Sequence, residues 1–186
     1  MTGGPGVAVV IITAALGFAA ALAVAAPEPR IVRVPDSPAE LRLDERWQPL
    51  PLPPGAADPP LGAWRHPSGA TLVLTRTAAP ATDAWRDKDR AAWAADVEAG
   101  VRAASPGYQR RERKLRDVAG VPTLDLRFRR KAGGAVEVVA MRFLFLRTHT
   151  ATIAIAVPDA RWSAARSAVE AAIAGFAPPV PLPPVR

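Results

Sequence analysis

The chain has 186 residues, carries a formal net charge of +7 and contains no cysteine. This length fits one domain with appended segments and is sufficient for one hydrophobic core. The lack of cysteine excludes a disulfide framework, a thiolate metal site, a thiol nucleophile and a lipid-modified cysteine. The positive charge favours anionic partners.

An apolar segment opens the chain. Residues 1–26 contain no charged side chain, and residues 7–26 are long enough to cross a bilayer, which takes about 20 apolar residues. The segment ends in an Ala-Val-Ala motif that signal peptidase can cut. The sequence therefore predicts either a signal peptide or a transmembrane anchor, and it leaves both open. We expect an exported or membrane-anchored domain in the cell envelope, on the extracytoplasmic side. Arg30 and Arg33 after the segment favour the opposite orientation, a tethered domain facing the cytoplasm.

Residues 27–61 are dense in proline, which predicts a linker with little regular structure. The motif Ser37-Pro-Ala-Glu40 is the one local signal. Ser at the N-cap, Pro at the first position and Glu at the third form a capping box, which predicts a short helix to about Glu45. Trp47 is expected to pack back onto the domain beneath a loop.

Residues 62–177 are predicted to form an α+β domain. Two short strands flank the turn His66-Pro-Ser-Gly69, where Pro presets φ and Gly permits a positive φ. A helix is expected from Thr82 or Asp83 to about Ala104. Its apolar stripe has the spacing of a core-facing helix surface and consists of Trp85, Trp93, Val97, Val101 and Ala104.

Four strands follow, at residues 108–118, 121–131, 135–146 and 150–157. The third is apolar at almost every position, so it needs cover on both faces of the sheet. The preceding helix can cover one face, and a final helix capped by Asp159 can cover the other. Residues 178–186 form a proline-rich tail.

This order of elements resembles the Mog1/PsbP-like fold. The resemblance rests on the hairpin of residues 64–70, the strands between residues 108 and 157, and the closing segment Ala172-Ile-Ala-Gly-Phe176. It implies a mostly antiparallel sheet of about six strands flanked by two helices, an α/β/α sandwich with short connections. Members are mainly binding, assembly or accessory proteins, and small exported ones often carry a signal or anchor. The resemblance transfers no catalytic residue.

The inventory of reactive residues predicts a protein that is not an enzyme and that holds no metal or cofactor. No HExxH motif occurs, and Ser68 lacks the elbow motif of serine hydrolases. An alternative remains. His66 and His149 lie in predicted turns that could meet at one end of the sheet, near Trp47 and Trp64. They would then line a small-molecule-binding or hydrolytic pocket.

Basic residues dominate residues 108–131. The candidate docking residues are Arg110, Arg111, Arg113, Arg127, Arg129 and Arg130. They predict a sheet face that binds an anionic partner, namely lipid headgroups, a wall polymer or an acidic protein. The competing interpretation is a solvated edge whose charges prevent aggregation. Nucleic acid is disfavoured as a partner because no aromatic residues alternate among the outward positions.

Overall fold

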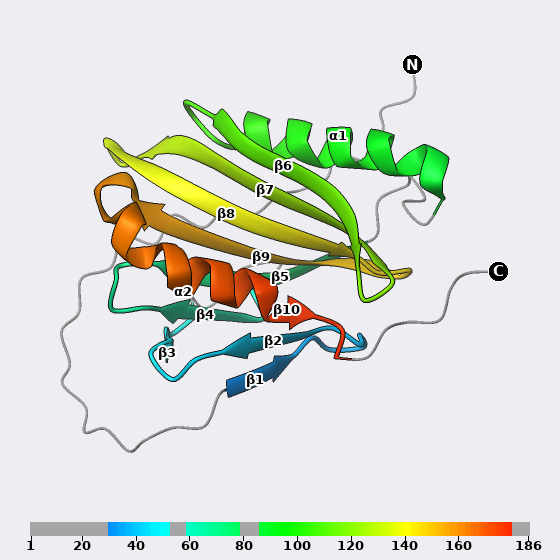
Figure 1. Ribbon diagram of the computed structural model, residues 1–186, viewed down its shortest axis with the longest axis horizontal. Coiled ribbons are helices and arrows are strands. Elements are labelled where there is room, and N and C mark those ends of the chain that lie inside the picture. The colour runs from blue at the N-terminus through cyan, green and yellow to red at the C-terminus, as the bar shows by residue number, and fades with distance from the viewer. Residues whose placement is uncertain (1–29, 53–58, 79–85, 180–186) are drawn as a thin grey trace.

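The computed structural model describes residues 30–52, 59–78 and 86–179 (Figure 1). The main element of the fold is one antiparallel sheet of seven strands. In spatial order the strands are β3 (Gln48–Pro49), β4 (Gly62–Arg65), β5 (Thr71–Ala78), β9 (His149–Pro158), β8 (Ala135–Phe145), β7 (Val121–Ala132) and β6 (Gln109–Val118). The six predicted strands are all present, and β3 adds a seventh.

The hairpin β8–β9 lies at the middle of this sheet, as its composition predicted. Its residues from Val138 to Phe145 are all buried, and in β9 the side chains of Ile153, Ile155 and Val157 are fully enclosed. The register places Phe143 opposite Thr152 and Ala140 opposite Ile155. A strand that is apolar on both sides is stable only between two covering layers, and the structure supplies both.

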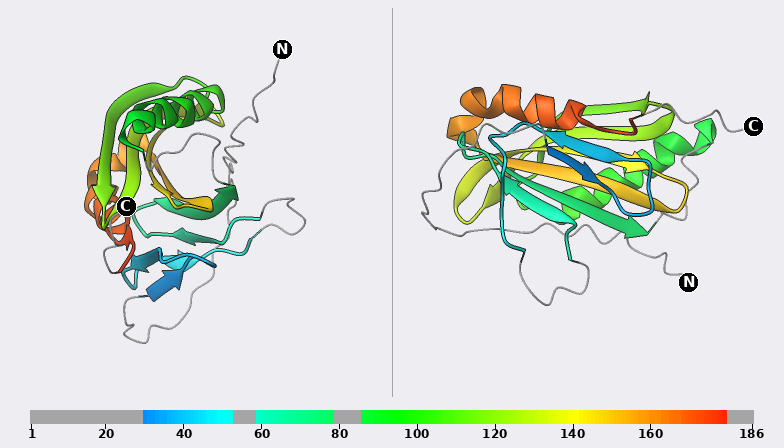
Figure 2. Two further views of the ribbon diagram at one scale, coloured as in Figure 1. Left: turned by 90° about the vertical axis from the view of Figure 1, so that its right-hand side faces the viewer. Right: turned by 90° about the horizontal axis from the view of Figure 1, so that it is seen from below.

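One covering layer contains α2 (Trp162–Ala174) and a second, three-stranded sheet. In that sheet β2 (Glu40–Leu43) pairs with both β1 (Arg30–Arg33) and β10 (Phe176–Ala177). The buried side chains of this layer pack on those of β4, β5 and β9 to form one hydrophobic cluster. Figure 2 shows this layer on the side of the curved sheet opposite α1.

The other covering layer is α1 (Asp87–Ala103), which lies on β6, β7 and β8. Trp93, Val97 and Val101 face the sheet, as their helical spacing predicted, and the Trp93 ring lies 5.3 Å from that of Phe145. The predicted helix start at Thr82 or Asp83, and Trp85, lie outside the described residues. The helix ends just before Pro106 and Gly107, which cannot continue it.

The short helix predicted from Ser37 is wrong, because the chain forms β2 instead. The Ser37 hydroxyl accepts the Ala39 N–H at 2.9 Å and so caps only a turn. Leu41 and Leu43 then alternate into the core, and Leu41 pairs with Phe176 of β10. Residues 30–52 of the predicted linker therefore contain three strands, β1, β2 and β3. The local capping signal is outweighed by pairing with a segment at the other end of the chain.

Asp159 was expected to cap the final helix, and this prediction is also wrong. Residues Asp159–Arg161 form a 3-10 turn before α2, and no side chain caps the helix start. The Asp159 carboxylate instead lies 2.8 Å from Nε of Arg129 on β7. A charge-assisted bond of this kind competes with capping for the same oxygens.

The apolar segment of residues 7–26 and residues 180–186 of the predicted tail lie outside the described residues. Among the residues that are described, no helix is long and apolar enough to cross a membrane. Signal peptide and anchor both remain predictions.

Candidate functional site

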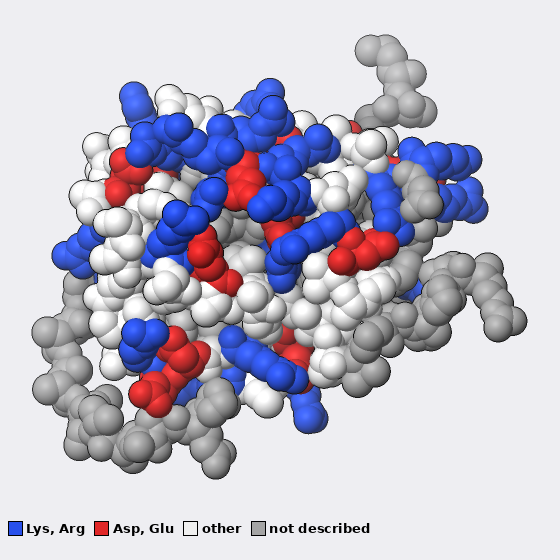
Figure 3. Space-filling model, in the orientation of Figure 1, with Lys and Arg blue, Asp and Glu red and all other residues white. Residues whose placement is uncertain are grey.

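Strand β6 forms one edge of the seven-stranded sheet, and among the described residues it pairs only with β7. Its side chains are mostly exposed, and a bulge interrupts the pairing between Arg110 and Glu112. Basic side chains gather along β6, β7 and α1, with acidic ones between them (Figure 3). The predicted basic segment thus coincides with an open sheet edge.

The six candidate arginines do not share one face of the sheet. Arg110 and Arg113 lie opposite Phe128 and Leu126, which face α1. Arg130 is on the same side, since it follows Phe128 by two residues along β7. The residues between these positions, Arg127 and Arg129, point towards α2. A single docking face made of all six is therefore excluded by the alternation of the strand.

The arginines on the α2 side, and Arg130, already have partners. Arg127 lies 2.7 Å from Glu112, and its guanidinium lies 5.7 Å from the centre of the Trp162 ring. Arg129 is bonded to Asp159, as described above. Arg130, whose side chain is only 8% exposed, lies 2.9 Å from Glu137. These contacts hold α2 and the β7–β8 hairpin in place, so this part of the candidate set is structural.

The arginines on the α1 side converge on one buried carboxylate, Glu98. Its Oε1 lies 3.1 Å from Arg110 Nη1 and 3.6 Å from Arg102 Nη2, and its Oε2 lies 3.4 Å from Arg113 Nε. Glu98 is 5% exposed, whereas all three arginines are exposed. One carboxylate therefore positions three guanidinium groups and neutralises only one of them.

Tyr108 also belongs to this cluster. Its hydroxyl donates to Glu98 Oε1 at 3.0 Å, and the Arg102 guanidinium lies 5.6 Å from its ring centre. Burial, followed by the hydrogen bond to Glu98, raises the pKa of Tyr108 to about 12. The phenol thus stays protonated and acts as a fixed donor.

We call Arg102, Arg110, Arg111 and Arg113 the basic edge. Arg111 lies exposed in the bulge and has no ion-pair partner among the described residues. Sequence reasoning found three of these four residues but missed Arg102 and Glu98. Glu98 lies three residues before Val101 of the apolar stripe, and this helical spacing was the available signal that it is buried.

The two histidines do not meet. His149 pairs with Ala78 at one end of β5, while His66 precedes Thr71 at the other end. Seven residues of strand separate these ends by about 23 Å at roughly 3.3 Å per residue. The predicted pocket shared by His66 and His149 is therefore wrong. A turn position alone does not fix which end of a sheet a residue occupies.

His66 is buried beneath Trp47, with ring centres 5.2 Å apart. Trp47 and Trp64 belong to one hydrophobic cluster. Nδ1 of His66 lies 2.8 Å from the Ser68 hydroxyl and accepts the Ser68 N–H at 3.2 Å. Burial, and secondarily the charge of Arg46, lowers the pKa of His66. The neutral ring therefore closes the turn that the sequence predicted.

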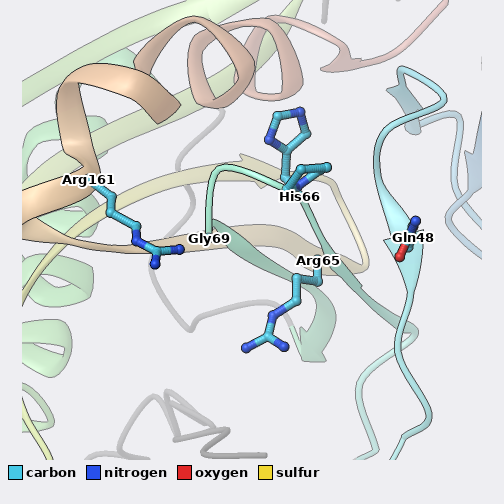
Figure 4. A pocket seen from close by; sticks show the side chains of 6 residues that line it. Gln48, Arg65, His66, Gly69 and Arg161 are labelled. Atoms are coloured by element: carbon cyan, nitrogen blue, oxygen red, sulfur yellow. The ribbon is translucent and has the colours of Figure 1, made fainter. Parts of the chain in front are cut away.

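The described residues do contain an open pocket of about 440 Å³ beside His66. It is lined by Gln48, Arg65, His66, Pro67, Gly69 and Arg161 (Figure 4). The Arg65 side chain and the His66 ring extend to opposite sides of the strand, as neighbours on a strand must. This pocket is not the predicted one, because of the predicted lining residues it includes only His66, and its other polar side chains are arginine and glutamine.

The sheet between two helices, with β10 closing a second small sheet, defines the class of this protein as a Mog1/PsbP-like α+β fold, as predicted. No protein-family model matches the sequence, and no curated protein matches it. The likeness is to solved structures. PsbP of the cyanobacterium Synechocystis (CyanoP) is 15% identical with a TM-score of 0.60, covering 87% of this chain and 97% of that chain.

Two further structures have the same fold. LpqN of Mycobacterium tuberculosis, described as involved in cell envelope biogenesis, is 16% identical with a TM-score of 0.56, covering 81% of this chain and 91% of that chain. PA94 of Pseudomonas aeruginosa, a protein of unknown function, is 17% identical with a TM-score of 0.51, covering 84% and 99%. At these identities the likeness establishes the fold alone.

Proposed function

We propose that this chain is a non-enzymatic accessory domain of the cell envelope that docks an acidic protein segment through the basic edge. The observation that carries the proposal is the Glu98 cluster. Three exposed guanidiniums are fixed around one buried carboxylate, and Arg111 adds a fourth positive charge beside them. Arginines held in place lose less side-chain entropy when they bind a carboxylate.

The envelope location rests on the apolar segment of residues 7–26, which favours export or anchoring. The fold likeness to LpqN, a protein involved in cell envelope biogenesis, supports the same compartment. An accessory role fits a fold whose site is a charged edge.

An acidic polypeptide fits this edge better than a lipid headgroup or a wall polymer. Beyond the bulge, β6 runs regularly from Glu112 to Val118, and among the described residues its outer backbone groups pair with no strand. An extended peptide can use both these backbone groups and the flanking arginines. A second copy of β6 would be repelled by like charges.

The arrangement around Ser68 supports a role other than hydrolysis. A serine hydrolase needs a base whose second ring nitrogen is held by an acid. Here Nδ1 of His66 contacts Ser68, while Nε2 is buried without a hydrogen-bond partner. The contact between His66 and Ser68 therefore stabilises the turn.

The proposal is tested by the binding of a labelled ten-residue peptide of alternating Glu and Val to the purified domain. A double variant with Arg102→Glu and Arg111→Glu should weaken binding by about tenfold or more, since both changes reverse charges at the contact. Arg110 and Arg113 are left intact because they lie closer to buried Glu98 than Arg102 does. The matched control, Arg65→Glu with Arg161→Glu, changes the charge equally and should bind normally.

Vesicles containing phosphatidylglycerol serve as the competing probe. If the domain binds these vesicles through the basic edge but ignores the peptide, the partner is a membrane and the acidic-protein proposal is rejected. If both double variants weaken peptide binding equally, the attraction is a general effect of net charge and the basic edge has no docking role.

A further inference from the structure

The pocket beside the β4–β5 turn contains two arginines that have no acidic partner. Arg65 ends β4, and Arg161 lies in the turn before α2. Both are exposed, and among the described residues neither forms an ion pair. Most arginines of β6 and β7 are paired, so two unpaired guanidiniums in one pocket need an explanation.

Strand register and one glycine bring these groups together. Gln48 pairs with Arg65, so both side chains lie on the same face. Gly69 has φ +89°, and a Cβ there would meet Arg161 Nη1 at 3.0 Å and Cδ at 3.1 Å. Because Gly69 has no side chain, Arg161 can lie across the turn (Figure 4).

The lining therefore offers two guanidinium groups and one amide, and it includes no carboxylate. Guanidinium groups bind phosphate oxygens through paired hydrogen bonds. His66 contributes no donor here, because its Nδ1 is used by Ser68 and its Nε2 is buried. The pocket volume of about 440 Å³ lies within the range of small-molecule sites.

We infer that this pocket binds a phosphate group between Arg65 and Arg161, with Gln48 as a third contact. The phosphate can belong to a soluble phosphate monoester or to a lipid headgroup. The site is separate from the basic edge, because five strand spacings divide β4 from β6, about 24 Å at roughly 4.8 Å each. The inference stands whether or not the basic edge docks a partner.

The test is calorimetric titration of the purified domain with glycerol phosphate at constant ionic strength, with chloride as the reference anion. The wild type should bind saturably. Arg65→Gln and Arg161→Gln should each weaken binding by about tenfold or more, as expected for loss of a charge-assisted hydrogen bond. Arg65→Lys should restore part of the loss. Arg111→Gln removes an equal charge from the basic edge and should leave binding unchanged.

A parallel arm uses vesicles of phosphatidic acid in phosphatidylcholine. Recovery on vesicles that is lost in both Arg65→Gln and Arg161→Gln, without binding of glycerol phosphate, assigns the phosphate to a lipid headgroup and supports the inference. The inference is overturned if neither probe binds saturably, or if Arg111→Gln weakens binding as much as the pocket variants. Melting temperatures identify any variant that fails to fold, and the Lys variant then replaces it.

Discussion

Arg142 on β8 and Asp125 on β7 form a bidentate ion pair, with Nε 2.7 Å from Oδ1 and Nη2 3.0 Å from Oδ2. Nη1 of Arg142 also donates to the carbonyl oxygens of Ile173 at 2.6 Å and Phe176 at 3.2 Å. One side chain of β8 thus connects β7, the end of α2 and β10.

Asp125→Asn should lower the free energy of unfolding by about 3 kcal/mol, because it leaves a buried guanidinium without its counterion. Burial alone would raise the pKa of Asp125, but the hydrogen bonds and charges of Arg142 and Arg116 outweigh burial and lower it. Urea denaturation measures the change. The control is Asp117→Asn in an exposed pair with Arg90, which should cost less than about 1 kcal/mol. Equal losses would contradict a structural role for the Arg142 pair.

The second sheet is integral to the domain, and Leu41→Ala tests this. Leu41 is fully buried on β2, so the substitution should cost about 3 kcal/mol through lost burial and a cavity. Ile31→Ala on neighbouring β1 removes a side chain that is 53% exposed and should cost less than about 0.5 kcal/mol. Similar small losses of stability for both variants in thermal or urea unfolding would support the prediction that residues 27–61 are a linker.

Stability should decline as the pH falls below about 6.5. Burial, followed by the charge of a nearby arginine, lowers the pKa of both His66 and His149. The unfolded chain then binds more protons than the folded chain once the pH falls below about 6.5. The contribution of the two neutral histidines to the free energy of unfolding is complete above about pH 6.5. It is lost as the pH falls through their pKa in the folded chain. A double variant, His66→Gln with His149→Gln, should show a flatter profile in urea unfolding at each pH. Parallel profiles would refute the effect.

Tyr108 reports directly on the Glu98 cluster, because it is the only tyrosine of the chain. The ultraviolet absorbance of its phenolate should titrate near pH 12 in the wild type. Glu98→Gln removes the charge that the phenolate would face, so the pKa should fall while staying above 10 through burial. Glu170→Gln on α2 should leave it unchanged. A Tyr108 pKa near 10 in the wild type would mean that the cluster is open to water.

Local sequence patterns predicted the elements whose buried side chains recur with a regular period. The apolar run of β8, the alternation of β9 and the stripe of α1 each follow from side-chain periodicity. Such patterns could not predict β2, because its partner β10 lies more than a hundred residues further along the chain. Ser37-Pro-Ala-Glu40 also matches a helix start, and only tertiary pairing overrules it.

The candidate site was predictable only in part, for a similar reason. Composition identified the basic segment, but strand alternation and ion pairs decide which arginines remain available. Glu98 gains its role only because α1 lies over β6. The separation of His66 from His149 depends on the register of β5 with β9, which the turn residues do not encode.

Amide hydrogen exchange along β6 tests the docking of an acidic strand most directly. With the alternating Glu–Val peptide bound, the outward amides between Glu112 and Val118 should exchange more slowly, because they become bonded to the added strand. Those of the control strand β4 should not change. Unchanged exchange along β6 at saturating peptide would contradict docking at this edge.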